Sequence, residues 1–398
     1  MSWPREHLAG CCEIITKGTT PMSFGMPYTD SGIPFLRVQN IRDGGVLLDG
    51  DTLFVSQDTH KFFARSSIQR GDVLLSIAGT IGRSAIVPAS APPEMNCNQA
   101  VAVIRLRHQL EKRFLLHWLN TRDALSQMTG GVVTGTISNL SLTQVRNLGI
   151  PLPPLAEQRR IAEVLDRAEA LRAKRRAALD QLDSLTQSLF LDFFGDPATN
   201  PKGWPQITLG DALAAIRNGA NAMQSTEGNG WPITRIETIS DATINPQRVR
   251  WIEPDDSLLA DFRLQPGDIL FSHINSVEHI GKTALYSGEP ALLIHGINLL
   301  RLRPKLDSVE PVWLLHLLKH DVIRTHFRTR CKRAVNQASL NQPDIKSLKT
   351  FLPPIKLQRE FARRVTAVER LKTAHRASLA ELDALFATLQ HRAFRGEL

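Results

Sequence analysis

The feature of this sequence that most constrains its fold is a repeat. Short motifs of the first half recur in the same order in the second half, and Pro353 follows Pro153 by 200 residues. The pairs are Trp3-Pro4 and Trp204-Pro205, Gly32–Arg37 and Gly230–Arg235, Gly71–Ser76 and Gly267–Ser272, Ile81–Arg83 and Ile280–Lys282, Ile104–Arg107 and Leu300–Arg303, and Leu152–Gln158 and Leu352–Gln358. One match alone would be chance, but an ordered series predicts a tandem duplication.

Each copy has a strand-rich first part. Short runs of Val, Ile, Leu and Phe alternate with Gly, Pro, Asn and Asp, as at 72–77, 100–106 and 268–271. This pattern is typical of short strands joined by turns. One helix is predicted to interrupt the strands, near 112–120 in the first copy and 312–320 in the second.

The last part of each copy predicts one long helix. Residues 155–194 and 355–394 contain neither Gly nor Pro and are dense in Ala, Leu, Glu, Arg and Lys, which are strong helix formers. A proline pair precedes each segment, and Gly195 and Gly396 end them. At about 1.5 Å per residue, each helix would span about 60 Å.

Apolar residues in these helices recur at spacings of three and four. The first helix has Ile161, Val164, Ala168, Leu171, Ala178, Leu182, Leu185 and Leu189, and the second has Val368, Leu371, Leu382, Leu385 and Leu389. Such a seam favours a coiled coil between the two helices over a helix lying on its own domain, which is too small to cover it. Arg175 and His375 interrupt the seam at matching positions, so we expect them to help set its register.

The expected fold class is therefore α+β. It comprises two similar strand-rich α/β domains separated by a long antiparallel two-helix coiled coil, with a pseudo-twofold that follows from the repeat. The predicted boundaries are 1–154 and 196–354 for the domains, and 155–195 and 355–398 for the spacer helices. Two similar heads at a fixed separation suit a partner with two spaced sites, such as duplex DNA.

The composition excludes several classes of protein and favours a polyanionic partner. The chain has 398 residues, 42% hydrophobic and 22% charged, which excludes a disordered chain or a fibre. No apolar stretch long enough for a membrane span and no secretory signal is evident, and the four cysteines lack Cys-x-x-Cys spacing. A cytoplasmic protein is expected. The formal net charge of +9 favours a polyanion such as nucleic acid.

A search for catalytic motifs predicts no chemistry within the chain. The proline pairs follow Leu152 and Leu352, not the Asn or Asp of an amino-methyltransferase. The turn 281–283 lacks the first glycine of a phosphate-binding loop, and 343–346 lacks the second acid of a metal-dependent nuclease. The twelve histidines are scattered singly, so no metal site is predicted.

Taken together, the repeated proline motif, the Gly-Asp-Val/Ile-Leu-x-Ser element, the turn at 80–82 and the Trp-Pro segments resemble the specificity subunit of type I restriction–modification systems. The resemblance covers essentially the whole chain. It implies two target recognition domains, each reading one half of a bipartite site on double-stranded DNA. It also implies a non-catalytic subunit in the cytoplasm of a bacterium or archaeon.

The same resemblance implies partners and a docking surface. Two methyltransferase subunits would carry S-adenosylmethionine, and restriction (motor-nuclease) subunits would carry ATP and Mg, so that this chain itself binds no cofactor. The residues expected to dock partners are those of the proline motifs: Pro153, Pro154, Glu157, Gln158, Pro353, Pro354 and Gln358. The second motif departs from the first, because Lys356-Leu357 replaces Ala156-Glu157.

Candidate DNA-contacting residues share the chemistry of base or phosphate recognition. Arg suits guanine, Asn and Gln suit adenine, and Lys and Arg bind phosphates. The candidates are Arg37, Gln39, Asn40, Arg42, Arg83, Gly135 and Thr136 in the first half, and Arg235, Lys282, Arg328, Arg330, Lys332, Arg333, Asn336 and Gln337 in the second. Residues 324–333 include five cations and no acid, whereas the matching stretch 126–139 is uncharged. Unlike surfaces predict an asymmetric target.

Alternative functions remain open at this stage. One is the specificity component of a related, type II-like restriction complex that cuts on both sides of its site. Another is a self-contained DNA methyltransferase, and a third is a coiled-coil interaction protein that does not touch DNA.

Overall fold

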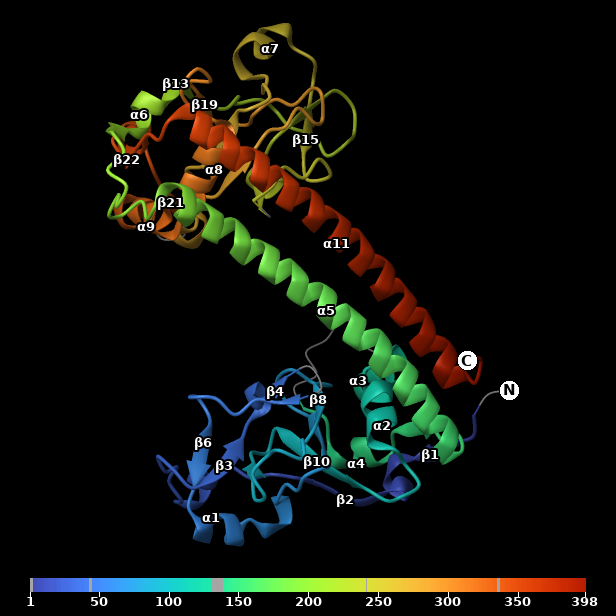
Figure 1. Cartoon of the computed structure of the whole chain (residues 1–398). Coiled ribbons are helices and arrows are strands. Elements are labelled where there is room, and N and C mark those ends of the chain that lie inside the picture. Colours follow the sequence, from blue (N-terminus) through green and yellow to red (C-terminus); the bar gives the residue numbers. More distant parts are fainter. Residues whose placement is uncertain (1–2, 43–44, 131–138, 241, 335–336) are drawn as a thin grey trace. The chain divides into compact units, whose positions relative to one another are not determined.

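The computed structural model describes residues 3–42, 45–130, 139–240, 242–334 and 337–398 (Figure 1). The chain divides into two compact units. Unit 1 consists of Met1–Arg176 with Ala377–Leu398, and unit 2 is Ala177–Arg376. The division passes through both long helices, so each unit contains one globular part and a segment of each long helix.

Unit 1 is built on a four-stranded antiparallel sheet. Its strand order is β2-β10-β7-β8, with β2 at Cys12–Lys17, β10 at Val101–Leu106, β7 at Val73–Ser76 and β8 at Ser84–Ile86. The apolar runs predicted as strands alternate their side chains between the two faces. One face packs against Phe114 and Trp118 of α2 (Lys112–Leu119), and the other covers a second apolar cluster.

Shorter elements complete unit 1. Strand β3 (Ile33–Leu36) lies between β6 (Leu53–Val55) and β9 (Asn96–Cys97), and the 3-10 turn η3 (Val38–Asn40) follows it. The remaining elements are the pairs β4 (Ile41–Arg42) with β5 (Gly45–Val46) and β1 (Arg5–His7) with β11 (Gly149–Pro151), the turns η1 (Leu8–Cys11), η2 (Pro21–Phe24) and η4 (Ala64–Ser66), and helices α1 (Gln57–Phe62), α3 (Arg122–Thr129) and α4 (Leu142–Arg146).

Unit 2 repeats this architecture. Its sheet has the order β13-β19-β16-β18, formed by Leu213–Asn218, Leu299–Pro304, Ile269–Ser272 and Thr283–Leu285, with α8 (Pro311–Lys319) packed on it. The other elements are β12 (Gln206–Thr208) with β22 (Lys349–Phe351), β14 (Trp231–Ile233) with β15 (Arg250–Ile252), β17 (Ile274–Asn275), β20 (Lys332–Ala334) and β21 (Gln337–Ser339), η5 (Ile236–Ile239), η6 (Val277–His279), α6 (Leu209–Ala212), α7 (Asp256–Phe262), α9 (Asp321–Arg330) and α10 (Gln342–Lys346).

The duplication extends to buried ion pairs. Arg105 donates to both carboxylate oxygens of Asp72 at 2.9 and 2.8 Å, and Arg303 donates to those of Asp268 at 2.7 and 2.7 Å. Each aspartate is buried and also accepts a backbone N–H from the residue three positions earlier. The predicted tandem duplication of α+β domains is confirmed by this shared scaffold.

The long helices are α5 (Leu155–Phe194) and α11 (Ile355–Arg395), as the sequence predicted. In unit 1, Arg172 contacts Asp383 at 2.6 Å and Arg160 contacts the carbonyl of Leu398 at 3.1 Å. In unit 2, Lys372 contacts Asp183 at 2.7 Å, and the ring of Phe361 packs on Phe190. In both units, residues later in α5 pair with residues earlier in α11, so the two helices are antiparallel.

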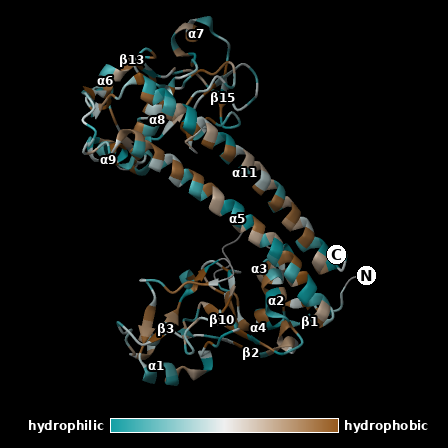
Figure 2. Ribbon diagram, in the orientation of Figure 1, coloured by the Kyte–Doolittle hydropathy of each residue, from teal (hydrophilic) through white to brown (hydrophobic). Residues whose placement is uncertain are grey.

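The predicted seam was wrong in part. Hydrophobic and hydrophilic residues alternate along both helices (Figure 2), but four predicted seam leucines are exposed: Leu171 at 53%, Leu185 at 44%, Leu371 at 53% and Leu385 at 50%. The alternate seam positions lie one residue later, at Arg172 and Lys372 among others; Lys372 is buried, and Arg172 is shielded beside Asp383. The prediction selected the leucines because the spacing of apolar residues gives no sign of a cation that ion pairs hold in the seam.

Among the described residues, no helix is both long and apolar enough to cross a membrane.

Candidate nucleic-acid interface

Three loops converge at one end of the central sheet in unit 2. The turn η5 follows β14, while β17 and η6 lie in the connection from β16 to β18. Strand β17 pairs with β21, whose own partner β20 follows α9. The fold therefore gathers segments that carry several predicted DNA-contacting residues, although they lie far apart in the sequence.

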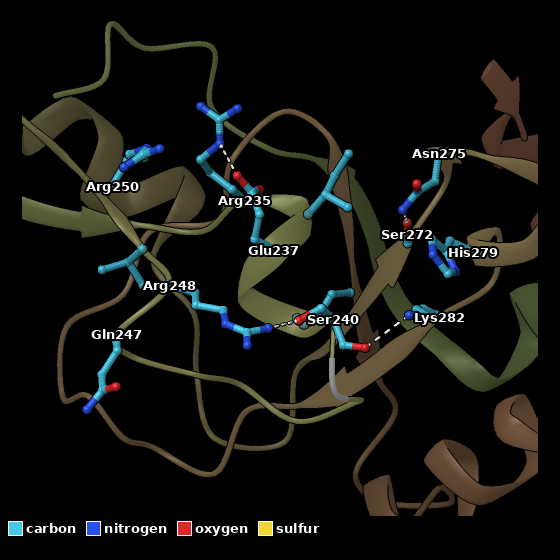
Figure 3. Close-up of a pocket in the computed structure, with 13 residues that line it drawn as sticks. Arg235, Glu237, Ser240, Gln247, Arg248, Arg250, Ser272, Asn275, His279 and Lys282 are labelled. Atoms are coloured by element: carbon cyan, nitrogen blue, oxygen red, sulfur yellow. Dashed lines mark hydrogen bonds and ion pairs between the residues drawn. The ribbon is translucent and has the colours of Figure 1, made fainter. Parts of the chain in front are cut away.

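These loops enclose a hollow of about 480 Å³ (Figure 3). Its lining includes the guanidinium groups of Arg235, Arg248 and Arg250 and the ammonium of Lys282. Glu237 is the single acidic residue among the described residues of the lining. An excess of positive charge in a concave surface favours an anionic ligand.

Ser240, at the end of η5, links two of these cations. Lys282 donates to the backbone carbonyl of Ser240 at 3.0 Å, and Arg248 donates to its hydroxyl. On the other side, Arg235 donates to the side-chain oxygen of Gln224 at 3.1 Å and lies 3.4 Å from Glu237. Three of the four cations, Arg235, Arg248 and Lys282, are thus oriented by the protein before any ligand arrives.

A basic segment formed by α9 and β20 adjoins the hollow. Arg328 donates to the carbonyl of Glu278 in η6 at 2.8 Å, so the end of α9 is fastened to a wall of the hollow. Arg330, Lys332 and Arg333 are exposed. Of the remaining candidates, Asn336 lies outside the described residues, and the backbone of Gln337 pairs with Ala334 in β21 and β20.

The candidates in unit 1 occupy the corresponding loops. Arg37 precedes η3 and donates to the carbonyl of Asp51 at 2.8 Å, while Gln39, Arg42 and Arg83 are exposed. Gly135 and Thr136 lie outside the described residues.

Asn40 does not have the role predicted for it. Its side chain is 2% exposed, accepts the backbone N–H of Arg37 at 2.8 Å and donates to the carbonyl of Leu47 at 3.0 Å. Thr238 makes the matching bonds in unit 2, with the backbone of Arg235 and Arg248. These side chains fix a turn, so Asn40 has no free edge for a base.

The two glutamines of the proline motifs are also internal. Gln158 accepts the N–H of Glu111 at 2.8 Å and donates to the carbonyls of Gln109 and Pro153 at 3.0 and 2.9 Å. Gln358 makes the same three bonds, at 2.9, 3.1 and 2.7 Å, with Glu310, Ser308 and Pro353. Both side chains are buried. The expectation that they face a partner is corrected: they fasten each long helix to the preceding domain.

The other motif residues differ in accessibility. Pro153 and Pro353 are buried, whereas Pro154 and Pro354 are exposed. Glu157 is half-buried and pairs with Arg160 at 2.7 Å. The hydrogen bond from Arg160 lowers the pKa of this carboxyl, so Glu157 is anionic at neutral pH.

Arg248 and Arg250 were not singled out from the sequence. They lie close together in the chain, Arg248 in the turn before β15 and Arg250 at its first residue. Neither residue lies in a motif shared by the two halves, so the repeat gave no reason to inspect them.

Several titratable groups of the described chain are buried. No cluster of three or more His, Cys, Asp or Glu suited to a metal occurs among the described residues. Burial raises the pKa of the Cys12 and Cys97 thiols to about 12, which leaves them protonated and poorly nucleophilic. Burial lowers the pKa of His316 to about 3, and this histidine packs against Phe361.

Comparison with known proteins agrees with this architecture. The model of the type I restriction modification DNA specificity domain matches residues 3–181 and 201–384. A Methanocaldococcus jannaschii protein named as a putative type I restriction enzyme MjaX specificity subunit is 42% identical over 206 residues, and the match spans about half of either chain: 49% of this one and 48% of the relative. The EcoKI specificity subunit of Escherichia coli K12 is 27% identical over 395 residues, 93% of this chain and 83% of the relative.

Two solved structures share the fold. A chain of a type I restriction–modification system aligns with a TM-score of 0.59 at 23% identity, covering 100% of this chain and 98% of that one. The S subunit from M. genitalium aligns with a TM-score of 0.58 at 15% identity, covering 99% and 96%. Because the family model matches both halves of the duplicated chain, the chain belongs to the family of type I restriction–modification DNA specificity subunits.

Proposed function

We propose that this chain is the DNA-reading subunit of a type I restriction–modification complex. Each unit recognises one half of an asymmetric bipartite site on duplex DNA, and partner subunits carry out the chemistry. The observation that carries this proposal is a duplicated scaffold whose loops differ in chemistry between the copies.

The contrast between scaffold and loops supports two different half-sites. The scaffold pairs Arg105–Asp72 and Arg303–Asp268 are the same in both units. By contrast, α9 of unit 2 carries four arginine or histidine side chains, whereas the matching α3 of unit 1 carries the single cation Arg122. Side chains on loops read base edges and phosphates, while the scaffold only positions them. Different loops on one scaffold therefore select different sequences.

An exposed flank of the helix pair supports docking of methyltransferase subunits. Arg176 and Asp383 approach to 3.6 Å on one flank of the seam in unit 1. Leu171 and Leu385 each come one residue before a seam position, whereas Arg176 and Asp383 each come one residue after one. Heptad geometry therefore places the two leucines on the opposite flank. Exposed leucines at this spacing suit an apolar helix of a partner. Unit 2 offers the related pair Leu185 and Leu371.

The proposal assigns catalysis and cofactors to the partners. One methyltransferase subunit docks on each unit and carries S-adenosylmethionine, and the restriction subunits carry ATP and Mg. The chain itself binds no cofactor and works in the cytoplasm. The names of the relatives, which are specificity subunits of type I restriction enzymes, support this assignment.

Methylome sequencing tests the proposal directly. Adenine methylation is mapped by single-molecule sequencing in a host that expresses the chain with its neighbouring methyltransferase subunit, and in a host that lacks only the chain. The proposal predicts a two-part motif with a fixed unspecified gap that disappears without the chain. If a soluble complex yields no chain-dependent motif and the purified chain binds no duplex, the proposal is wrong.

A further inference from the structure

The hollow of unit 2 has a counterpart in unit 1, and the strand registers identify it. In unit 2, β14 pairs with β15 so that Ile233 lies opposite Arg250. In unit 1, β3 pairs with β6 so that Phe35 lies opposite Leu53. Both β3 and β14 follow a glycine and have proline at their second position, so Ile233 matches Phe35 and Arg250 matches Leu53.

The matching positions carry different charges. Leu53 of unit 1 is aliphatic where Arg250 of unit 2 is cationic. The carbonyl of Arg248 accepts a hydrogen bond from Thr238 as the carbonyl of Leu47 accepts one from Asn40, so Leu47 matches Arg248. Unit 1 thus places two aliphatic side chains where unit 2 places two guanidinium groups. Arg235 and Lys282 have the cationic counterparts Arg37 and Arg83 in unit 1, so two of the four positive charges of the hollow belong to unit 2 alone.

Arg250 stands out among the cations of the hollow. Within the described part of the chain its side chain makes no hydrogen bond or ion pair, and no dashed line reaches it in Figure 3. It is nevertheless half-buried. Confining a guanidinium group without a compensating anion is unfavourable, which points to a ligand that supplies the negative charge.

The number of converging cations indicates which part of DNA fits. Arg235, Arg248, Arg250 and Lys282 come from three separate segments and line the same hollow. A base edge offers neutral acceptors that one guanidinium group satisfies. A phosphate carries a full negative charge and several acceptor oxygens, so it matches several cations at once.

We infer that this hollow, the phosphate seat (Arg235, Arg248, Arg250 and Lys282), binds a backbone phosphate of the DNA at the half-site read by unit 2. The inference rests on the proposed function. It adds that the two units hold DNA differently: unit 2 makes a salt-sensitive backbone contact with four cations, of which unit 1 has only two at the matching places.

The first test removes one cation at a time. The chain, in complex with its methyltransferase subunit, is titrated with a duplex that carries the methylome-mapped site, at several salt concentrations. We expect Arg250→Ala to weaken binding and to reduce the slope of log K against log salt by about 1, the effect of one lost phosphate contact. The loss should be the same on a duplex whose unit 2 half-site is scrambled, because a phosphate carries no sequence information.

Two further variants separate charge from base recognition and from folding. Arg248→Lys/Arg250→Lys retains the charge and should retain the wild-type slope, whereas a bidentate contact to guanine would be lost. Lys305→Ala/Lys349→Ala removes two exposed charges of unit 2 outside the hollow and should leave the slope nearly unchanged. Thermal unfolding checks that each variant is folded.

The outcomes distinguish this inference from the proposed function. Wild-type preference for the mapped site over the scrambled duplex tests sequence recognition itself. If that preference holds while Arg250→Ala leaves affinity and slope unchanged, DNA does not occupy the seat. If the variant instead changes the methylated motif at one half-site, the hollow reads bases and the phosphate assignment is wrong. Competition by free ATP at equal ionic strength, without an effect of duplex, would identify a nucleotide site and also overturn the inference.

Discussion

Replacement of Gln358 by alanine tests whether the proline motif fastens the fold or docks a partner. The side chain is fully buried and makes three hydrogen bonds, one accepted from Glu310 and two donated to Ser308 and Pro353. The substitution leaves one N–H and two carbonyls unpaired next to the start of α11. We expect the damage to fall on the stability of unit 2, because no part of this side chain reaches the surface.

The magnitude follows from the bond count. A typical hydrogen bond contributes about 0.5–1.5 kcal/mol net, so three bonds correspond to roughly 3 kcal/mol. In a unit of about 200 residues, 1 kcal/mol lowers the midpoint temperature by roughly 2–4 °C. We therefore expect the unfolding transition of unit 2 to fall by roughly 6–12 °C. Gln158→Ala should destabilise unit 1 by a similar amount, since it makes the same three bonds.

Scanning calorimetry measures the effect, and a pull-down with the methyltransferase subunit at low temperature measures docking. The matched control is Pro354→Ala, an exposed residue of the same motif. We expect Gln358→Ala to lower the transition temperature and to leave docking intact below it. Unchanged stability together with lost docking would refute the assignment, because it would mean that the glutamine acts on a partner.

Three further predictions follow from the helix pair and from buried histidine. Leu171→Glu/Leu385→Glu should abolish docking of a methyltransferase subunit on unit 1 without loss of duplex binding, as a pull-down and a gel-shift assay would show; retained docking would place the partner elsewhere. Asp383→Ala removes the carboxylate of α11 that pairs with Arg172 of α5 and should broaden the register of the helices in disulfide-crosslinking assays, and a single sharp register would contradict this role. Acidification should destabilise unit 2 through His316, because burial lowers the pKa of this histidine from 6.5 to about 3. Below about pH 6.5 the imidazole takes up a proton in the unfolded chain but not in the folded chain. The free energy of unfolding should therefore fall as the pH drops from about 6.5 towards 3, by up to about 1.4 kcal/mol per pH unit. His316→Phe should flatten this dependence in chemical denaturation series at pH 7 and pH 5, and an unaltered dependence would show that other groups cause it.

Much of the fold was readable because it is encoded in local patterns. The six repeated motifs predicted the duplication, and the structure shows that they mark equivalent strands, turns and helix starts. The long helices were predicted at 155–194 and 355–394 because helix formers, proline pairs and terminal glycines act over short distances along the chain. Arg235 and Lys282 were selected from matching motifs, and the fold places both in one hollow.

The sequence by itself determined which segments form strands and helices and that the architecture occurs twice. Only the tertiary structure decided which polar side chains are internal: Asn40, Gln158 and Gln358 resemble recognition residues until their buried backbone partners are seen. It also decided that Lys372 and not Leu371 faces the seam, and that Arg250 joins a hollow with residues of two other loops. The physical reason is that propensity and periodicity depend on neighbours in the chain, whereas hydrogen bonding, ion pairing and burial depend on groups that only folding brings together.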